Sequence, residues 1–247
     1  MNNKKLKGYL KDLRMPTIRK FYQEYANLAL KDNLSYEEYL FNLVEQEAQT
    51  RTRNRIKRYL RESKLPLDKT IAMFERKRLA ERDNRLVSVL LQGTFTEQCE
   101  NVLAFGNPGG GKTHLLCAIG HELIQMGKRV LFIPCSLLVQ KLLIAKRELE
   151  LPKYLKKLGR YDAIIIDDIG YVQHNREEME VLFTLLADRY EKSSLMITSN
   201  LPFSKWEKIF KDPMTTAAAI DRLVHHSIIL ELNVPSYRLE KSKEKNR

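Results

Sequence analysis

Gly106-Asn-Pro-Gly-Gly-Gly-Lys-Thr113 is the stretch that decides the fold of this 247-residue chain. The octet matches the pattern G-x-x-x-x-G-K-[ST] at every fixed position. An apolar run at 101–105 precedes it and predicts a buried strand, and an apolar run at 114–119 follows it and predicts a helix. A strand, a glycine loop and a helix in this order favour a phosphate-binding loop over an ordinary glycine turn. The octet therefore predicts a nucleoside triphosphate site.

Each residue type in this loop has a chemical role. Glycines let successive backbone N–H groups turn toward phosphate oxygens, and a helix N-terminus adds positive partial charge. We expect Lys112 to reach the outer phosphates and the Thr113 hydroxyl to bind Mg²⁺. The expected nucleotide-binding residues are Gly106, Asn107, Pro108, Gly109, Gly110, Gly111, Lys112, Thr113 and His114.

A second motif supports the first. Ala163-Ile-Ile-Ile-Asp-Asp168 predicts an apolar strand that ends in two carboxylates. Buried strands rarely end in paired acids without a use for the charge. We expect Asp167 to hold the Mg²⁺ coordination shell and Asp168 to polarise the attacking water. Together with the loop, the acids predict nucleoside triphosphate hydrolysis by positioning and charge stabilisation.

The charge of the chain is unevenly distributed. The net charge is +12, and residues 1–92 hold 21 Lys+Arg against 12 Asp+Glu, whereas residues 93–247 hold 22 against 19. A basic segment joined to an ATPase suggests a polyanionic partner, and a solvated helical face, which needs no partner, is the alternative.

Several protein classes are disfavoured by composition. The sequence contains no apolar run of the roughly 20 residues that a membrane span needs, and its start lacks a signal-peptide pattern, so we expect no membrane association and a cytoplasmic, bacterial location. Cys99, Cys117 and Cys135 show no metal-ligand spacing and suggest core packing in a reducing compartment.

The first part of the chain has helical periodicity. Apolar residues recur at helical spacing from Leu6 to Leu13, and Pro16 opens a second helical stretch. Ser35-Tyr-Glu-Glu38 is a capping box that predicts a third helix reaching Ser63. The aromatic residues of these helices favour a small core, although stacking on bases is an alternative. We expect a basic helical domain over residues 1–85.

Two basic runs make this domain a candidate DNA-binding domain. One begins at Arg51 on the third helix and the other at Arg76, and both are suited to contacting phosphates without strong base readout. The candidate DNA-binding residues are Arg51, Arg53, Arg55, Lys57, Arg58, Arg61, Lys64, Arg76, Lys77 and Arg78.

Strands and helices alternate from residue 101 onward. Five apolar runs are separated by helical patterns, which predicts an α/β fold with a parallel five-stranded sheet covered on both faces. We expect strands at 102–105, 130–133, 164–166, 195–200 and 228–232. Residues 86–100 are expected to be a connector, and residues 101–247 a P-loop ATPase domain.

With these residues assembled, the chain resembles the AAA+ ATPases of the DnaC/IstB group, and within it the IstB-like transposition helpers. The resemblance covers nearly all of residues 101–240. It rests on Gly-Lys-Thr-His-Leu at 111–115, Ile-Asp-Asp-Ile-Gly-Tyr at 166–171, Ile-Thr-Ser-Asn-Leu-Pro-Phe at 197–203, Ala-Ile-Asp-Arg-Leu-Val-His-His at 219–226 and Ser-Tyr-Arg-Leu at 236–239.

The resemblance implies roles for three further positions. Asn200 resembles the sensor residue that orients the hydrolytic water. Arg222 resembles the arginine that reaches the γ-phosphate in a neighbouring subunit, with an intrachain pair as the alternative, and Arg189 is a second candidate for that role. Residues 135–160 resemble a helical insertion that contacts nucleic acid in the DNA-initiator branch.

Two features depart from the usual AAA+ pattern. Asp168 stands where many members have Glu, and its shorter side chain weakens its assignment as the base. Only about a dozen residues follow the last expected strand. We therefore expect the C-terminal lid to be absent or minimal, and hydrolysis to be slow or to depend on neighbouring subunits or DNA.

The resemblance favours an ATP-hydrolysing regulator of transposition that forms a homo-oligomer on double-stranded DNA and recruits a transposase. A DnaC-like replicative helicase loader is the alternative with the same ATPase core. A metabolic nucleotide kinase fits less well, because the sequence contains no evident acceptor site and a kinase does not need the basic domain. Nothing in the sequence resembles a nuclease site.

Overall fold

A computed structural model describes residues 3–170, 176–202, 205–206, 221 and 223–237. The chain divides into two compact units, Met1–Arg58 and Tyr59–Arg247. The expected boundary at residue 85 is therefore too late. Residues 59–85 belong to the unit that holds the sheet, because packing and not charge defines a compact unit. The expectation about the lid falls on residues 238–247, which lie outside the described part.

The first unit is helical, as expected. It contains α1 (Asn3–Asp12), α2 (Pro16–Asp32) and the first part of α3 (Tyr36–Ser63). Its core is small, and its buried apolar residues are Leu10, Ile18, Tyr22 and Leu43. Tyr39, one of the aromatic residues, packs against this core and donates a hydrogen bond to the Tyr22 carbonyl oxygen at 3.1 Å. The aromatic side chains Tyr22 and Tyr39 therefore serve packing within this unit.

The predicted capping box at the start of α3 is confirmed. The Ser35 N–H donates to the Glu38 carboxylate at 2.8 Å, and the Glu38 N–H donates to the Ser35 hydroxyl at 3.2 Å. These bonds satisfy backbone groups that the first turn of a helix otherwise leaves unpaired. Asn33, with a φ of 52°, ends α2 in the left-handed conformation just before this start.

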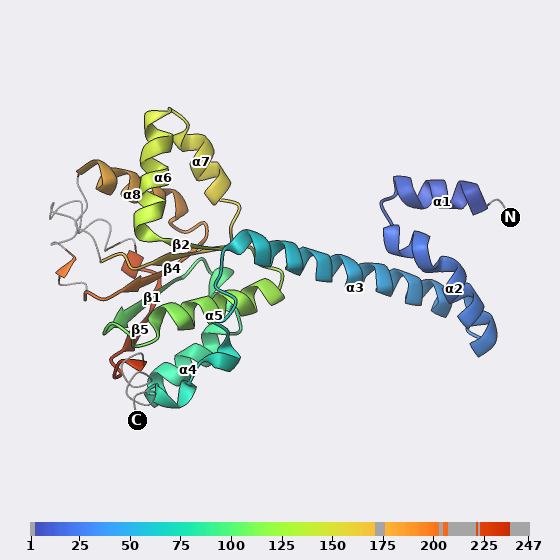
Figure 1. The fold of residues 1–247 in the computed structure, drawn as a ribbon, viewed down its shortest axis with the longest axis horizontal. Helices are drawn as coiled ribbons and strands as arrows, with labels where there is room; N and C mark the ends of the chain where they lie inside the picture. The colour runs from blue at the N-terminus through green and yellow to red at the C-terminus, as the bar shows by residue number, and fades with distance from the viewer. Residues whose placement is uncertain (1–2, 171–175, 203–204, 207–220, 222, 238–247) are drawn as a thin grey trace, which may run out of the picture. The chain divides into compact units, whose positions relative to one another are not determined.

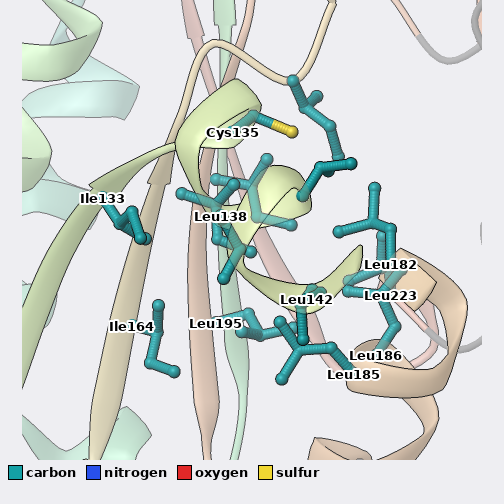
Figure 2. Close-up of a cluster of buried hydrophobic side chains, with 14 of the residues drawn as sticks. Ile133, Cys135, Leu138, Leu142, Ile164, Leu182, Leu185, Leu186, Leu195 and Leu223 are labelled. Atoms are coloured by element: carbon teal, nitrogen blue, oxygen red, sulfur yellow. The ribbon is translucent and has the colours of Figure 1, made fainter. Parts of the chain in front are cut away.

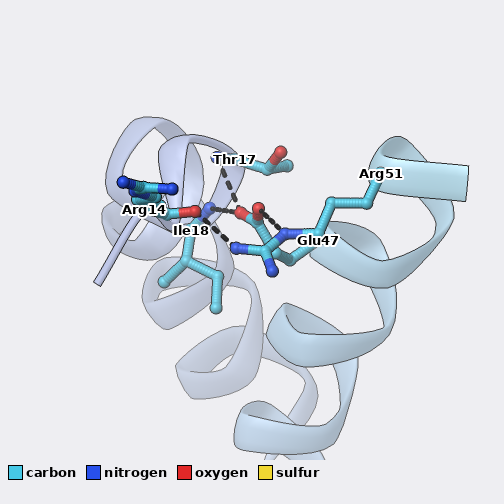
Figure 3. A network of polar contacts seen from close by, with 5 residues as sticks. All are labelled: Arg14, Thr17, Ile18, Glu47 and Arg51. Carbon is cyan, nitrogen blue, oxygen red and sulfur yellow. Dashed lines mark hydrogen bonds and ion pairs between the residues drawn. The ribbon is translucent and has the colours of Figure 1, made fainter. Parts of the chain in front are cut away.

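A buried carboxylate joins α3 to the start of α2. Glu47 is 5% exposed and accepts hydrogen bonds from the backbone N–H groups of Thr17 and Ile18, at 2.8 and 3.1 Å (Figure 3). Arg51, one turn further on, donates to Glu47 at 2.8 Å and to the Arg14 carbonyl oxygen. Because α2 has no side-chain cap of its own, Glu47 supplies the acceptor that its N-terminus needs.

The segment between α3 and the sheet is packed. It contains η1 (Ile71–Met73), η2 (Arg76–Arg78), α4 (Glu81–Leu90) and η3 (Thr94–Thr96). Val87, Leu90 and Phe95 are buried, and the Phe95 carbonyl accepts a hydrogen bond from the Ser194 hydroxyl at 3.4 Å. Residues 86–100, which were expected to be a connector, therefore also contribute buried apolar side chains from α4 and η3.

The predicted parallel five-stranded sheet is confirmed. Its strands follow the order β2-β3-β4-β1-β5, and every neighbouring pair is parallel. The strands are β1 (Asn101–Gly106), β2 (Val130–Pro134), β3 (Ala163–Asp167), β4 (Ser194–Ser199) and β5 (Ser227–Leu232). Each begins or ends within a residue or two of the range expected from the sequence.

Helices cover both faces of this sheet (Figure 1). They are α5 (Lys112–Gln125), α6 (Cys135–Arg147), α7 (Leu151–Leu158) and α8 (Arg176–Arg189). Leucines of α6 and α8 pack on side chains such as Ile164 and Leu195 (Figure 2). The adjacent residue Ile165 points to the opposite face, where its Cδ1 lies 2.9 Å from the position a Cβ of Gly120 would take on α5. Among the described helices, none is long and apolar enough to cross a membrane.

Candidate nucleotide-binding site

The strand order gathers the predicted catalytic residues at one edge of the sheet. β4 lies between β1 and β3, so the segments that follow these three strands are neighbours. The phosphate loop follows β1, the acid pair ends β3, and Asn200 follows β4. Ligands of open parallel sheets bind at the carboxyl ends of the strands, which is where these residues meet.

Glycines in the loop are required by backbone geometry. Gly106 has a φ of 140°, and a Cβ there would lie 2.2 Å from the Leu232 carbonyl oxygen. Gly109 and Gly111 have φ values of 79° and 90°, a region that side chains strongly disfavour. Substitution at any of the three would shift the loop, so the glycine pattern has a steric as well as a phosphate-binding reason.

Lys112 is held by three acceptors. Its ammonium group donates to the carbonyl oxygens of Gly106 and Asn107 at 2.8 and 2.9 Å, and to Asn200 Oδ1 at 2.5 Å. The residue is only 7% exposed. A lysine so placed presents a positive charge across the mouth of the loop, where a triphosphate would compete with Asn200 for it.

The Thr113 hydroxyl and Asp167 carboxylate meet directly. Thr113 Oγ1 donates to Asp167 Oδ1 at 2.7 Å, and the Thr198 hydroxyl donates to the same oxygen at 2.7 Å. Hydroxyl and carboxylate oxygens are hard donors of the kind that Mg²⁺ prefers, and Mg²⁺ in ATPases takes few protein ligands besides substrate phosphate and water. Thr113 and Asp167 thus fit a Mg²⁺ site, and their role as metal ligands stays a prediction.

Asp168 is held in an uncommon backbone conformation. Its φ is 63°, and its N–H donates to the Thr198 hydroxyl at 2.7 Å. Its carboxylate accepts a hydrogen bond from Asn200 Nδ2 at 3.0 Å. Burial, and then the charge of Asp167, raise the pKa of Asp168, while Lys112 opposes the shift. A raised pKa is what a carboxylate that accepts a proton near neutral pH needs.

Thr198 was missed as a site residue. Its hydroxyl fixes both acids, yet in the sequence it is a β-branched residue in an apolar strand, where threonine is ordinary. Thr198 lies two residues before Asn200, and side chains two apart along a strand point to the same face. This spacing is the only sequence signal that Thr198 faces the site.

A pocket of about 320 Å³ surrounds these groups. Phosphate-loop residues, both acids, Thr198 and Asn200 line it. It is also lined by residues that the sequence did not suggest, which are Lys69, Met73, Phe74, Glu75, Leu79, Val234 and Tyr237. His114 lies at the wall, where Nε2 donates to the Thr70 carbonyl oxygen at 3.0 Å and the ring meets Phe74 edge-on at 5.4 Å.

The two candidate arginines for acting in trans have different outcomes. Arg222 lies outside the described residues. Arg189 is 1% exposed, and its guanidinium donates at 3.0 Å to the carbonyl oxygens of Leu158, Tyr161 and Ser194. Burial lowers the pKa of Arg189 to about 10. Arg189, the weaker candidate, is therefore not available to reach a neighbour, because it ties α8 to three backbone segments of its own chain.

The candidate DNA-binding residues fall into two groups. The exposed group consists of Arg53, Arg55, Lys57, Arg58, Arg61, Lys64 and Lys77, and all except Lys77 lie on or just after α3. In the second group, Arg51 binds Glu47, Arg76 donates to Asn84 and Ser88 on α4, and Arg78 lines the nucleotide pocket. These three have intrachain contacts that the sequence did not suggest.

The fold and the site together define a P-loop nucleotide-binding protein of the AAA+ class. The phosphate loop, the acid pair and the polar residue after β4 stand on a five-stranded parallel sheet with helices on both faces. The chain belongs to the family described as IstB-like ATP binding protein, whose family model matches residues 8–245.

Comparisons with individual proteins agree. The chain is 42% identical over 239 residues to a putative insertion sequence ATP-binding protein of Sinorhizobium fredii, covering 96% of this chain and 80% of that protein. Its fold resembles AMPPCP-bound DnaA from Aquifex aeolicus, with a TM-score of 0.56 and 20% identity, over 74% of this chain and 56% of that one. It also resembles the DnaC helicase loader, with a TM-score of 0.52 and 19% identity, over 71% of this chain and 98% of the loader chain.

Proposed function

We propose that this protein binds and hydrolyses ATP, binds double-stranded DNA and regulates the transposition of an insertion sequence. In this proposal it assembles as a homo-oligomer on target DNA in the ATP state and recruits a transposase. The observation that carries the ATPase part is the cluster formed by Lys112, Thr113, Asp167, Asp168 and Asn200. The name of the Sinorhizobium fredii relative supports the link to an insertion sequence.

The residues of the cluster divide the work of hydrolysis. Lys112 binds the outer phosphates, and Thr113 with Asp167 would hold Mg²⁺, which neutralises charge on the phosphates when bound. Asp168 accepts the proton of the attacking water, and Asn200 orients that water or the carboxylate. Since Asn200 bridges Lys112 and Asp168, phosphate binding at Lys112 would release Asn200 toward the water.

DNA binding is assigned to the exposed basic side chains of α3. Arg53, Arg55 and Lys57 lie within two turns of one helix and are exposed. Arg53 and Lys57, four residues apart, lie on one face of the helix and Arg55 lies on another, and exposed cations of this kind bind duplex phosphates with little sequence preference. We therefore expect affinity for duplexes of any sequence, with strong dependence on salt.

A helicase loader is the second candidate. The likeness to the DnaC helicase loader supports it only through the fold, because the identity is 19%. A loader acts mainly through contact with a replicative helicase, whereas a transposition regulator acts through duplex DNA and a transposase. The basic surface of α3 favours the transposition regulator.

The discriminating experiment measures what the full-length protein binds in the ATP state. With the non-hydrolysable analogue AMPPCP and Mg²⁺, the protein should bind duplex DNA of arbitrary sequence and form larger assemblies on it by light scattering. The transposase of the same insertion sequence should join the complex on a gel-filtration column. Failure to bind duplex DNA, together with capture of purified replicative helicase, would overturn the proposal in favour of the loader.

A further inference from the structure

The nucleotide pocket has a wall that the catalytic residues do not explain. Two segments far apart in sequence form it: residues 69–79, which precede the sheet, and residues 234–237, which follow β5. Both belong to the unit that holds the sheet. The second segment includes part of the Ser-Tyr-Arg-Leu stretch at 236–239, to which the phosphate chemistry gives no role.

The segment after β5 is fastened to the phosphate loop. The Tyr237 N–H donates to the Gly109 carbonyl oxygen at 3.2 Å. A Cβ on Gly109 would lie 2.2 Å from Ser236 Oγ, and one on Gly110 would lie 3.6 Å from a methyl group of Val234. This segment therefore contacts the glycines at the middle of the loop. None of the contacts just described involves Asp167 or Asp168.

Arg78 joins the two segments. Its guanidinium donates to the Pro235 carbonyl oxygen at 2.9 Å and lies over the Tyr237 ring, 5.2 Å from the ring centroid. Phe74 approaches the loop from the same segment, with Cε2 3.0 Å from the position a Cβ of Gly111 would take. Planar groups from residues 74, 78 and 237 thus line the pocket beside the glycines, together with the apolar side chains of Leu79 and Val234.

We propose that Phe74, Arg78 and Tyr237 form the base-binding end of the nucleotide site, so that Arg78 binds nucleotide and does not bind DNA. The inference rests on the proposed ATP-binding function and extends it. A nucleoside triphosphate needs cations and N–H groups at one end and flat, largely apolar surfaces at the other. Aromatic rings and guanidinium planes are the side chains on which a base stacks.

The position of Arg78 separates it from the DNA-binding candidates. It is half-buried, whereas Lys77 beside it is exposed. Its hydrogen bond to Pro235 and its contact with Tyr237 fix the guanidinium in the pocket wall. To bind Arg78, a duplex phosphate would have to displace these contacts. A base that enters the pocket could stack on the guanidinium while both contacts remain.

The test compares ATP with inorganic tripolyphosphate, which carries the phosphates but no base. Calorimetry of the full-length protein in Mg²⁺ would measure both ligands for Arg78→Ala and Tyr237→Leu. The control is Arg82→Ala, which removes a nearby exposed arginine. We expect Arg78→Ala and Tyr237→Leu to lose about fivefold to 100-fold in ATP affinity. Their tripolyphosphate affinity should stay within twofold of wild type, and the Arg82→Ala control should bind both ligands normally.

Several results would overturn the inference. One is unchanged ATP affinity in Arg78→Ala and Tyr237→Leu. Another is an equal loss for ATP and tripolyphosphate, which would mean that these residues only shape the phosphate loop. Retained tripolyphosphate binding also shows that each variant is folded. A wild-type protein that binds neither ligand would instead reject the proposed function, so the two failures are distinguishable. Duplex affinity of Arg78→Ala, measured by anisotropy, should equal that of wild type.

Discussion

The nucleotide pocket and the basic run of α3 differ in how their charged groups are held. In the pocket, Lys112, Asp167 and Asp168 are each fixed by hydrogen bonds within the chain. On α3, Arg53, Arg55 and Lys57 are exposed side chains on a regular helix. The pocket is organised by contacts within its own chain, whereas the basic side chains of α3 would take their geometry from the proposed DNA partner. Substitutions in the pocket should therefore abolish a chemical step, and substitutions on α3 should change affinity in small increments.

The largest expected effect concerns Arg222, which is proposed to complete a neighbour's pocket. Arg222→Ala and Lys112→Ala should each be nearly inactive alone, with losses of up to about 10³–10⁵ in hydrolysis rate for the arginine. Mixed together on DNA, they should partly recover activity, because some interfaces combine an intact loop with an intact Arg222. Absence of recovery despite demonstrated co-assembly would mean that Arg222 acts within its own chain.

The next effect is on the proton-accepting acid. Asp168→Asn should keep ATP affinity but reduce the hydrolysis rate by about 10²–10⁴ and trap the DNA-bound assembly. Because burial and Asp167 raise the pKa of Asp168, the wild-type rate should fall on acidification at a higher pH than a free aspartate implies. A stopped assay of phosphate release against pH measures the hydrolysis rate of Asp168→Asn and the pH dependence of the wild-type rate. Wild-type turnover in Asp168→Asn would remove this residue from the mechanism.

A smaller effect is expected on α3. Replacing Arg53, Arg55 and Lys57 with alanine should weaken binding to all duplex sequences alike and reduce the slope of log affinity against log salt by up to about 0.9 per lost phosphate contact. The matched control replaces Lys4, Lys5 and Lys7 on α1, which removes the same charge from another helix of the same unit. An equal change of slope in both variants would show that only total charge matters.

The smallest expected effect concerns Glu47, the partner of Arg51 at the start of the basic run. Glu47→Gln should destabilise the first unit by about 1–3 kcal/mol, because the N–H groups of Thr17 and Ile18 lose a charged acceptor. Burial alone would raise the pKa of Glu47, but hydrogen bonds from Arg51 and from these two N–H groups outweigh it and lower the pKa. The stabilisation is therefore present above the pKa of an unfolded glutamate and is lost as pH falls through the lowered value.

Thermal unfolding of the full chain, with the exposed Glu45→Gln as control, measures this effect. An Arg51→Ala variant should follow Glu47→Gln in stability while leaving the salt slope of DNA binding nearly unchanged. A large change of slope in Arg51→Ala would return this residue to the DNA-binding surface.

The sequence predicted the pocket better than the surface for a physical reason. The chemistry of the loop and acid pair requires fixed residue types at fixed spacing, so residues 106–113 and 167–168 were identifiable along the chain, and the strand order brought them together. Thr198 and Tyr237 act through contacts with residues distant in sequence, which no local pattern records. Arg189 and Arg51 were misleading because a charge in a sequence does not reveal whether it meets solvent, a ligand or a backbone carbonyl.

ATP binding by wild type and Lys112→Ala tests the central claim most directly. Calorimetry with Mg²⁺ and a non-hydrolysable ATP analogue should show binding to wild type and a loss on the order of 1.5–3 kcal/mol or more in the variant, which is roughly tenfold to more than 100-fold in affinity. Equal affinity in the two proteins would contradict the assignment of residues 106–113 as the phosphate-binding loop.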